Sequence, residues 1–174
     1  MENVDIEPQL VEMVETMELI HLKNMQWFSR EHMDVYKLLA KEAKKITKNK
    51  DKEKFTVELR QDGALDIHNK KKDTFVYNID PFTYGDEKAK AVKAKKVKKI
   101  IFDGTVLGTH ITSVIKEHKP KKVLVAEKNI QIFRCSSYVI DYEELNKISI
   151  FEFCLDKSKY EIGKKDLVIS IDDL

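Results

Sequence analysis

The chain has 174 residues, of which 42% are hydrophobic and 36% are charged. This length and apolar content are sufficient to bury one sizeable core, and the low counts of glycine and proline, 5 and 3, exclude a largely disordered chain. The formal net charge of +2 conceals a strongly basic middle, because residues 1–40 carry 3 basic and 8 acidic side chains, residues 41–128 carry 23 and 13, and residues 129–174 carry 6 and 9.

Two helices are predicted at the start of the chain. Pro8 is tolerated in a first helical turn, and apolar residues then recur at helical spacing at Leu10, Met13, Val14, Met17 and Ile20. Ser29 is the predicted cap of a second helix with a lysine-rich end. We therefore expect an acidic amphipathic helix over residues 1–28 and a single α/β domain over residues 29–174, with residue 98 as an alternative internal boundary.

The apolar period changes to two between residues 55 and 79, which predicts three short strands. Asp62-Gly63 is typical of a two-residue type I′ hairpin turn between the first pair. Lys70, Lys71 and Lys72 form the next turn. This segment is expected to be a three-stranded antiparallel meander whose apolar face is covered by a helix.

A lysine-rich helix is expected after Gly85 and Asp86, since alanine and lysine are good helix formers. Its seven lysines are Lys88, Lys90, Lys93, Lys95, Lys96, Lys98 and Lys99. Apolar runs at residues 100–102 and 123–126, separated by a short helix, then predict one right-handed βαβ crossover. Further apolar runs, at 130–133, 138–140, 148–155 and 167–171, predict a strand-rich C-terminal part, so the expected fold class is α/β (α+β).

Segregated positive charge favours a non-enzymatic nucleic-acid-binding accessory protein within a larger assembly, because polyanions respond to local charge density. The seven lysines of residues 88–99 are expected to supply the main contact, and Lys70, Lys71 and Lys72 a secondary one. The partner is expected to be DNA or RNA, bound without sequence preference, or an acidic protein. The order of one helix, three strands and a lysine-rich helix resembles the double-stranded-RNA-binding domain. This chain departs from that family's Lys-Lys-x-Ala-Lys pattern and from its Gly-Pro-x-His-like loop.

Two alternatives stay open. One is a structural or inhibitory interaction module that docks on a protein partner through the acidic, methionine-containing N-terminal helix. The other is a divergent nuclease, because the element order also resembles the PD-(D/E)xK nucleases, which hold Mg²⁺ between carboxylates on adjacent strands. Its catalytic candidates are Glu58, Asp66 and His68.

Cys135 and Cys154 do not form a close-spaced metal or redox motif, so neither a metal site nor a cofactor is expected. No signal peptide or apolar run long enough for a membrane span is recognisable. These features predict an intracellular, cytoplasmic protein.

Overall fold

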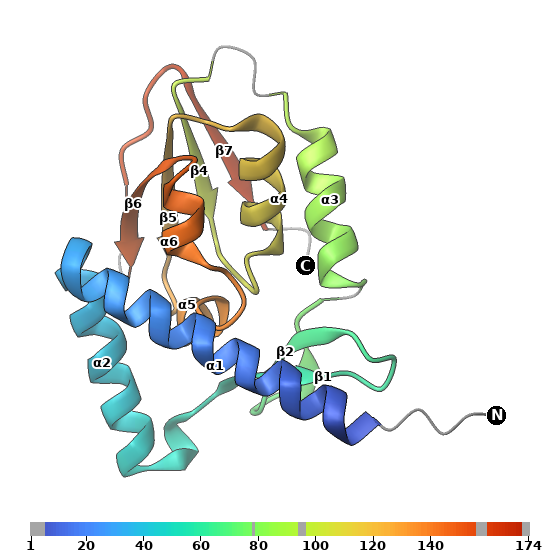
Figure 1. Ribbon diagram of the computed structural model, residues 1–174. Coiled ribbons are helices and arrows are strands. Elements are labelled where there is room, and N and C mark those ends of the chain that lie inside the picture. The colour runs from blue at the N-terminus through green and yellow to red at the C-terminus, as the bar shows by residue number, and fades with distance from the viewer. Residues whose placement is uncertain (1–5, 78, 94–96, 156–159, 172–174) are drawn as a thin grey trace.

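The computed structural model describes residues 6–77, 79–93, 97–155 and 160–171. Within them the chain forms a three-stranded antiparallel sheet of order β1-β2-β3 and a four-stranded parallel sheet of order β6-β5-β4-β7 (Figure 1). Helices precede the first sheet and pack around the second. The predicted mixed α/β class, with N-terminal helices and an antiparallel meander, is therefore confirmed.

The two N-terminal helices, α1 and α2, span Ile6–Glu31 and Met33–Lys48. The chain breaks between them at His32, whose ring packs against Trp27 and Phe153 with centroid distances of 4.7 and 4.9 Å. The predicted cap at Ser29 is wrong, because Ser29 lies inside α1 and its hydroxyl donates to the carbonyl of Gln26 at 2.7 Å. His32 makes no capping side-chain hydrogen bond either, so aromatic packing accompanies the break in place of a cap.

Helix α1 is attached to a distant part of the chain by the fully buried side chain of Asn24. Its amide group donates to the carbonyls of Ser137 and Ile140 at 2.8 and 2.6 Å. Its carbonyl oxygen accepts the backbone N–H of Tyr142 at 3.0 Å. A buried amide satisfied in this way fixes the register of α1 against the parallel-sheet half of the molecule.

The antiparallel sheet follows a short 3₁₀ turn, η1. The bounds are η1 Lys50–Lys52, β1 Phe55–Leu59, β2 Leu65–Asn69 and β3 Thr74–Phe75. The predicted hairpin is present, but Arg60 and Ala64 still pair by a backbone hydrogen bond of 2.9 Å. The loop therefore has three residues and not two, with Gly63 at a φ of 81°. The third strand is shorter than predicted and ends at Phe75.

Helix α3 spans Pro81–Ala91, earlier than the predicted lysine-rich helix. Asp80 caps it by accepting the N–H of Thr83 at 2.7 Å, and Pro81 occupies the first turn, where its missing N–H costs nothing. The expected continuation to Lys99 is wrong, because the backbone turns extended at Val92 and Lys99 already belongs to β4.

The parallel sheet and its connections complete the fold. Their bounds are β4 Lys99–Asp103, α4 Thr109–His118, β5 Lys122–Glu127, α5 Ile130–Ser136, α6 Tyr142–Asn146, β6 Ile150–Leu155 and β7 Asp166–Ser170. The predicted β4-α4-β5 crossover is present. Residues 130–133, predicted as a strand, are helical, because Asn129 caps α5 by accepting the N–H of Gln131 at 3.0 Å.

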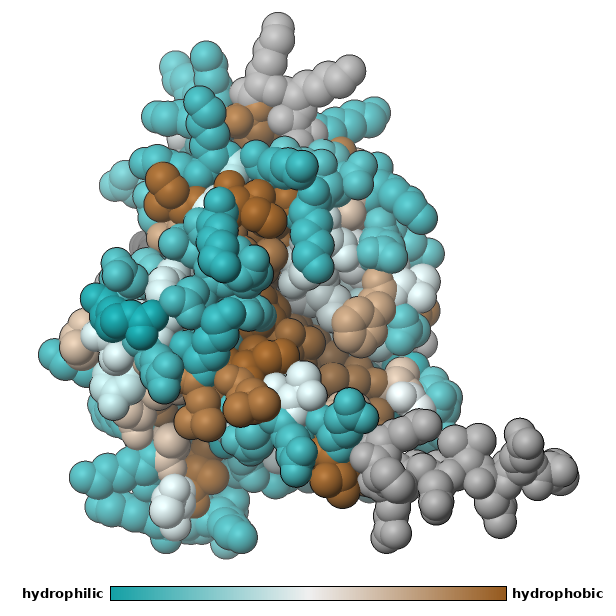
Figure 2. All heavy atoms as spheres, viewed as in Figure 1, coloured by the Kyte–Doolittle hydropathy of each residue, from teal (hydrophilic) through white to brown (hydrophobic). Residues whose placement is uncertain are grey.

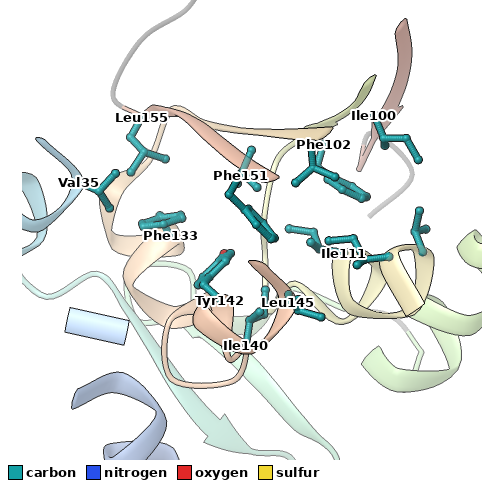
Figure 3. Packing of buried hydrophobic residues seen from close by; sticks show 14 of the residues in the cluster. Val35, Ile100, Phe102, Ile111, Phe133, Ile140, Tyr142, Leu145, Phe151 and Leu155 are labelled. Carbon is teal, nitrogen blue, oxygen red and sulfur yellow. The ribbon is translucent and has the colours of Figure 1, made fainter. Parts of the chain in front are cut away.

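A single apolar cluster lies between this sheet and its helices (Figure 3). Rings of Phe133, Tyr142 and Phe151 meet aliphatic side chains such as Ile111 and Leu155 there. Ring centroids of Phe133 and Tyr142 are 5.6 Å apart, a distance typical of favourable aromatic contacts. This cluster makes the parallel sheet the rigid part on which the loops and α3 are positioned.

Candidate functional site

Open α/β sheets usually bind their ligands beyond the carboxyl ends of the strands, where the strand order reverses. In this sheet the chain runs from β4 to β5 to β6 and then places β7 on the other side of β4, so the reversal lies between β4 and β7. That edge is covered here by the antiparallel sheet and by the start of α3 (Figure 1). The chain itself therefore occupies the usual ligand position.

The cover is built on the loop between β4 and α4, residues 104–108. Val106 and Leu107 are 2% and 0% exposed and pack in one cluster with Tyr77 and Tyr84. The N–H of Leu107 donates to the hydroxyl of Tyr77 at 3.3 Å, and the hydroxyl of Thr109 donates to the carbonyl of Pro81 at 2.5 Å. Apolar burial and hydrogen bonds together hold the antiparallel sheet and α3 against this loop.

Glu127 anchors the same loop from the end of β5. One carboxylate oxygen accepts both the N–H and the hydroxyl of Thr105, at 2.9 and 3.0 Å. The other accepts the N–H of Asn129 at 2.8 Å. The Glu127 carboxylate is only 7% exposed and has no ion pair with any residue that the structure describes. These hydrogen bonds offset the cost of burying its charge.

His110, in the first turn of α4, is fully buried between the rings of Tyr84 and Phe102, with centroid distances of 6.1 and 5.7 Å. Neither ring nitrogen makes a hydrogen bond of good geometry among the described residues, although the Gly104 backbone is close enough to interact with the ring. Burial lowers the pKa of His110 to about 4; the Gly104 backbone opposes this shift and the nearby Lys88 ammonium assists it. The imidazole is therefore neutral at physiological pH.

An open groove of about 720 Å³ lies next to the covered edge, between α3 and α4. The two helices approach closely at Gly85, where an added Cβ would lie 2.8 Å from the carbonyl carbon of Thr109. The side chains lining it are Phe82, Asp86, Ala89 and Lys90 of α3, Thr109, Thr112, Ser113, Lys116 and Glu117 of α4, and Val139. This set is named the α3–α4 groove below.

The α3–α4 groove combines hydroxyl groups, both signs of charge and one exposed ring. The hydroxyl of Ser113 on α4 donates to a carboxylate oxygen of Asp86 on α3 at 2.9 Å, and this bond orients the Asp86 carboxylate. Phe82 is 54% exposed and lines the groove with its ring. Donors, acceptors and an apolar face within one concave surface suit a polyhydroxylated ligand.

The lysines predicted to bind nucleic acid are divided between separate places. The turn of Lys70, Lys71 and Lys72 lies by the antiparallel sheet, whereas Lys98 and Lys99 lie at the opposite end of the parallel sheet (Figure 1). Lys88 and Lys90 are on α3, Lys93 follows its end, and Lys95 and Lys96 lie outside the described residues.

Several of these lysines also have local partners. Lys70 pairs with Glu53 at 2.8 Å, and the Lys88 ammonium lies 5.3 Å from the centre of the Tyr84 ring. Lys99 lies 3.7 and 3.8 Å from carboxylate oxygens of Glu152 and Asp166. Their positive charge is therefore partly compensated in place.

The three catalytic candidates of the nuclease hypothesis are also divided. Glu58 and His68 meet across the hairpin at 3.2 Å. Asp66 is fully buried, and it accepts the N–H groups of Ile67 and Tyr77 at 2.6 and 3.2 Å and pairs with Arg60 at 3.3 Å. Burial raises the pKa of Asp66, against the opposing effect of these partners. No group of three or more His, Cys, Asp or Glu side chains suited to a metal ion occurs among the described residues.

The bonds of Asp66 predict a structural role that can be measured. Asp66→Asn keeps one acceptor oxygen but loses the charge facing Arg60, so the free energy of unfolding should fall by about 1–2 kcal/mol in urea denaturation. Asp73→Asn is the control, because the Asp73 side chain is 93% exposed. Its effect should stay within about 0.5 kcal/mol. Equal stabilities of the two variants would contradict the structural role.

Comparison with known proteins gives two matches. The sequence model of the family described as "Glycosyltransferase Maf N-terminal domain" matches residues 20–150. Among solved structures, a MAf glycosyltransferase from Magnetospirillum magneticum AMB-1 is similar in fold, with a TM-score of 0.62 at 10% sequence identity over 81% of this chain. This chain spans 28% of the length of that protein. No curated protein sequence matches.

The family match corrects the functional predictions from sequence. The nucleic-acid-binding accessory protein is wrong, as are its interaction-module and nuclease alternatives, and with them the expected nucleic-acid or acidic-protein partner. The lysine content indicates positive charge but does not identify the ligand or partner that this charge binds. No described helix is both long and apolar enough to cross a membrane. Since the match covers well over half of the 174 residues, this chain belongs to the family of Maf glycosyltransferase N-terminal domains.

Proposed function

We propose that this chain acts as the N-terminal domain of a glycosyltransferase and supplies a saccharide-binding surface, the α3–α4 groove, rather than the transfer chemistry. The observation that carries the proposal is the family match over residues 20–150. Membership connects the chain with glycosyl transfer, and the groove offers the ligand chemistry that such a role requires.

The covered carboxyl ends of the parallel strands support our assignment of saccharide binding, and not the transfer reaction, to this chain. Activated substrates of α/β enzymes commonly bind at the carboxyl ends of parallel strands. Here Tyr77, Val106 and Leu107 fill that position with buried side chains. The α3–α4 groove, in contrast, is open and lies beside this edge, since Thr109 lines the groove and also bonds to Pro81.

The chemistry of the groove supports a sugar as its ligand. A saccharide presents hydroxyl groups that donate and accept hydrogen bonds, and C–H faces that pack on apolar surface. Asp86 and Glu117 accept, Lys90 donates, and Phe82 presents an exposed ring.

The test is binding of the labelled chain to an array of immobilised glycans. Thr112→Trp places a large side chain in the groove and should abolish binding to the glycans that the unmodified chain retains. Thr47→Trp is the matched control, since Thr47 is exposed on α2, away from the groove, and should leave binding unchanged. Absence of glycan binding, or binding that survives in Thr112→Trp, would show that the groove is not a saccharide site.

A further inference from the structure

A second concave surface lies at the opposite edge of the parallel sheet, where its strands begin. It is an open depression of about 590 Å³ and is lined by Lys98, Lys99, Lys122, Lys164 and Lys165, together with Glu152, Gly163 and Asp166. This set is named the lysine basin. It lies at the top of the molecule as drawn, where Figure 2 shows mainly hydrophilic side chains.

Three separate segments of the chain form the lysine basin. Lys98 directly precedes β4 and Lys99 is its first residue. Lys122 is the first residue of β5, and Lys164 and Lys165 directly precede β7. The segments are tied together by the backbone, since the N–H of Lys98 donates to the carbonyl of Lys165 at 2.8 Å. The turn before β7 is held by Asp166, which accepts the N–H of Gly163 at 2.8 Å. The lysine positions are therefore set by the sheet rather than by a loose tail.

The charges of the lysine basin are not balanced within it. Five ammonium groups face two carboxylates, and both carboxylates lie near Lys99, at 3.7 Å from Glu152 and 3.8 Å from Asp166. Lys98, Lys122, Lys164 and Lys165 make no ion pair within the part of the chain that the structure describes. Four like charges held around one hollow repel one another, and a multiply charged anion would relieve that repulsion.

The volume of the lysine basin and its lysine side chains restrict the chemical class of ligand that it can bind. A volume of about 590 Å³ falls in the range of small-molecule sites. Lysine is a compact point charge that binds phosphate oxygens through its charge and its N–H donors. A diphosphate carries enough negative charge for several ammonium groups, whereas a neutral sugar would leave them unpaired.

We propose that the lysine basin binds the phosphate groups of a small, soluble ligand that carries a diphosphate. This inference is independent of the proposed function, because it concerns the opposite edge of the sheet and different residues. A phospholipid headgroup presents the same phosphate chemistry, so the experiment separates a soluble source from a membrane source.

The experiment is calorimetric titration of the chain with inorganic pyrophosphate, uridine diphosphate and uridine at low salt. Pyrophosphate and uridine diphosphate should bind, uridine should not, and added salt should weaken binding through screening. The triple variant Lys98→Gln, Lys164→Gln, Lys165→Gln should raise the Kd about tenfold, equivalent to about 1.4 kcal/mol.

The matched control removes the same charge elsewhere. Lys41→Gln, Lys44→Gln and Lys48→Gln replace three exposed lysines of α2 and should leave the Kd unchanged. An equal rise in Kd in the two triple variants would mean that only net charge matters, and it would overturn the proposed site. The absence of pyrophosphate binding by the unmodified chain would also overturn it. Sedimentation with phosphatidylglycerol-containing vesicles is the membrane arm, and binding to vesicles without binding to pyrophosphate would also overturn the proposal.

Discussion

Gly85→Val is expected to lower the free energy of unfolding by about 3 kcal/mol, the upper end of the usual cost of overpacking, because it forces a side chain into the backbone of a neighbouring helix. A Cβ at this position would lie 2.8 and 2.9 Å from the carbonyl carbon and oxygen of Thr109 and 3.0 Å from the nitrogen of His110. Backbone atoms cannot rotate away as a flexible side chain can. Relief therefore requires α3 to move off α4, which disturbs both the groove and the covered sheet edge.

The measurement is chemical denaturation of Gly85→Val beside Glu87→Val. Glu87 lies on the same helix and is exposed, so its replacement carries the helix-propensity cost of valine without the clash. The control should lose no more than about 1 kcal/mol. Equal destabilisation by the two substitutions would mean that α3 and α4 are not in close contact at Gly85.

Local patterns were sufficient to predict the antiparallel sheet and the first βαβ unit. Period-two alternation and Asp62-Gly63 located the hairpin, although the loop is one residue longer than the predicted turn. The start of α3 was missed even though Asp80-Pro81 is a recognisable cap followed by a first-turn proline. The apolar run at 130–133 favours a strand, because short apolar runs are ambiguous, whereas the cap at Asn129 indicates the helix that the structure has.

The sites depend on contacts that no local pattern contains. Lys164 and Lys165 join Lys98 only because β7 pairs with β4, a choice of strand order that is made by tertiary packing. The lysine run at 88–99 looked like one helical face, but the helix ends at Ala91. Counting charges along the chain therefore does not show which lysines lie together in the folded protein. The sequence likewise contained no sign that the hairpin would cover the ligand edge of the second sheet.

His110 is expected to make the protein sensitive to mild acid. Its ring is fully buried, and burial lowers its pKa to about 4 from an ordinary 6.5, against the opposing interaction with the Gly104 backbone. An unfolded chain exposes the same ring to water. Between pH 6.5 and 4 the unfolded state therefore binds a proton that the folded state does not.

The sign of the effect follows directly. Stability is greatest above pH 6.5, where the ring is neutral in both states, and falls as the pH is lowered towards 4. The shift corresponds to roughly 3 kcal/mol across this window, since one pKa unit is about 1.4 kcal/mol. His21 acts in the same direction, because burial and then Arg134 lower its pKa to about 4. Its contribution should be smaller, as its ring is only partly buried.

His110→Phe separates this effect from the other titrating groups. A phenyl ring keeps the contacts with Tyr84 and Phe102 but binds no proton, so carboxylates and His21 titrate alike in both proteins. The free energy of unfolding, measured by urea denaturation from pH 7 down to 4, should decline by roughly 3 kcal/mol less in the variant than in the unmodified chain. Parallel pH profiles would mean that the pKa of His110 is not lowered in the folded protein. The buried, neutral ring inferred for the covered sheet edge would then be wrong.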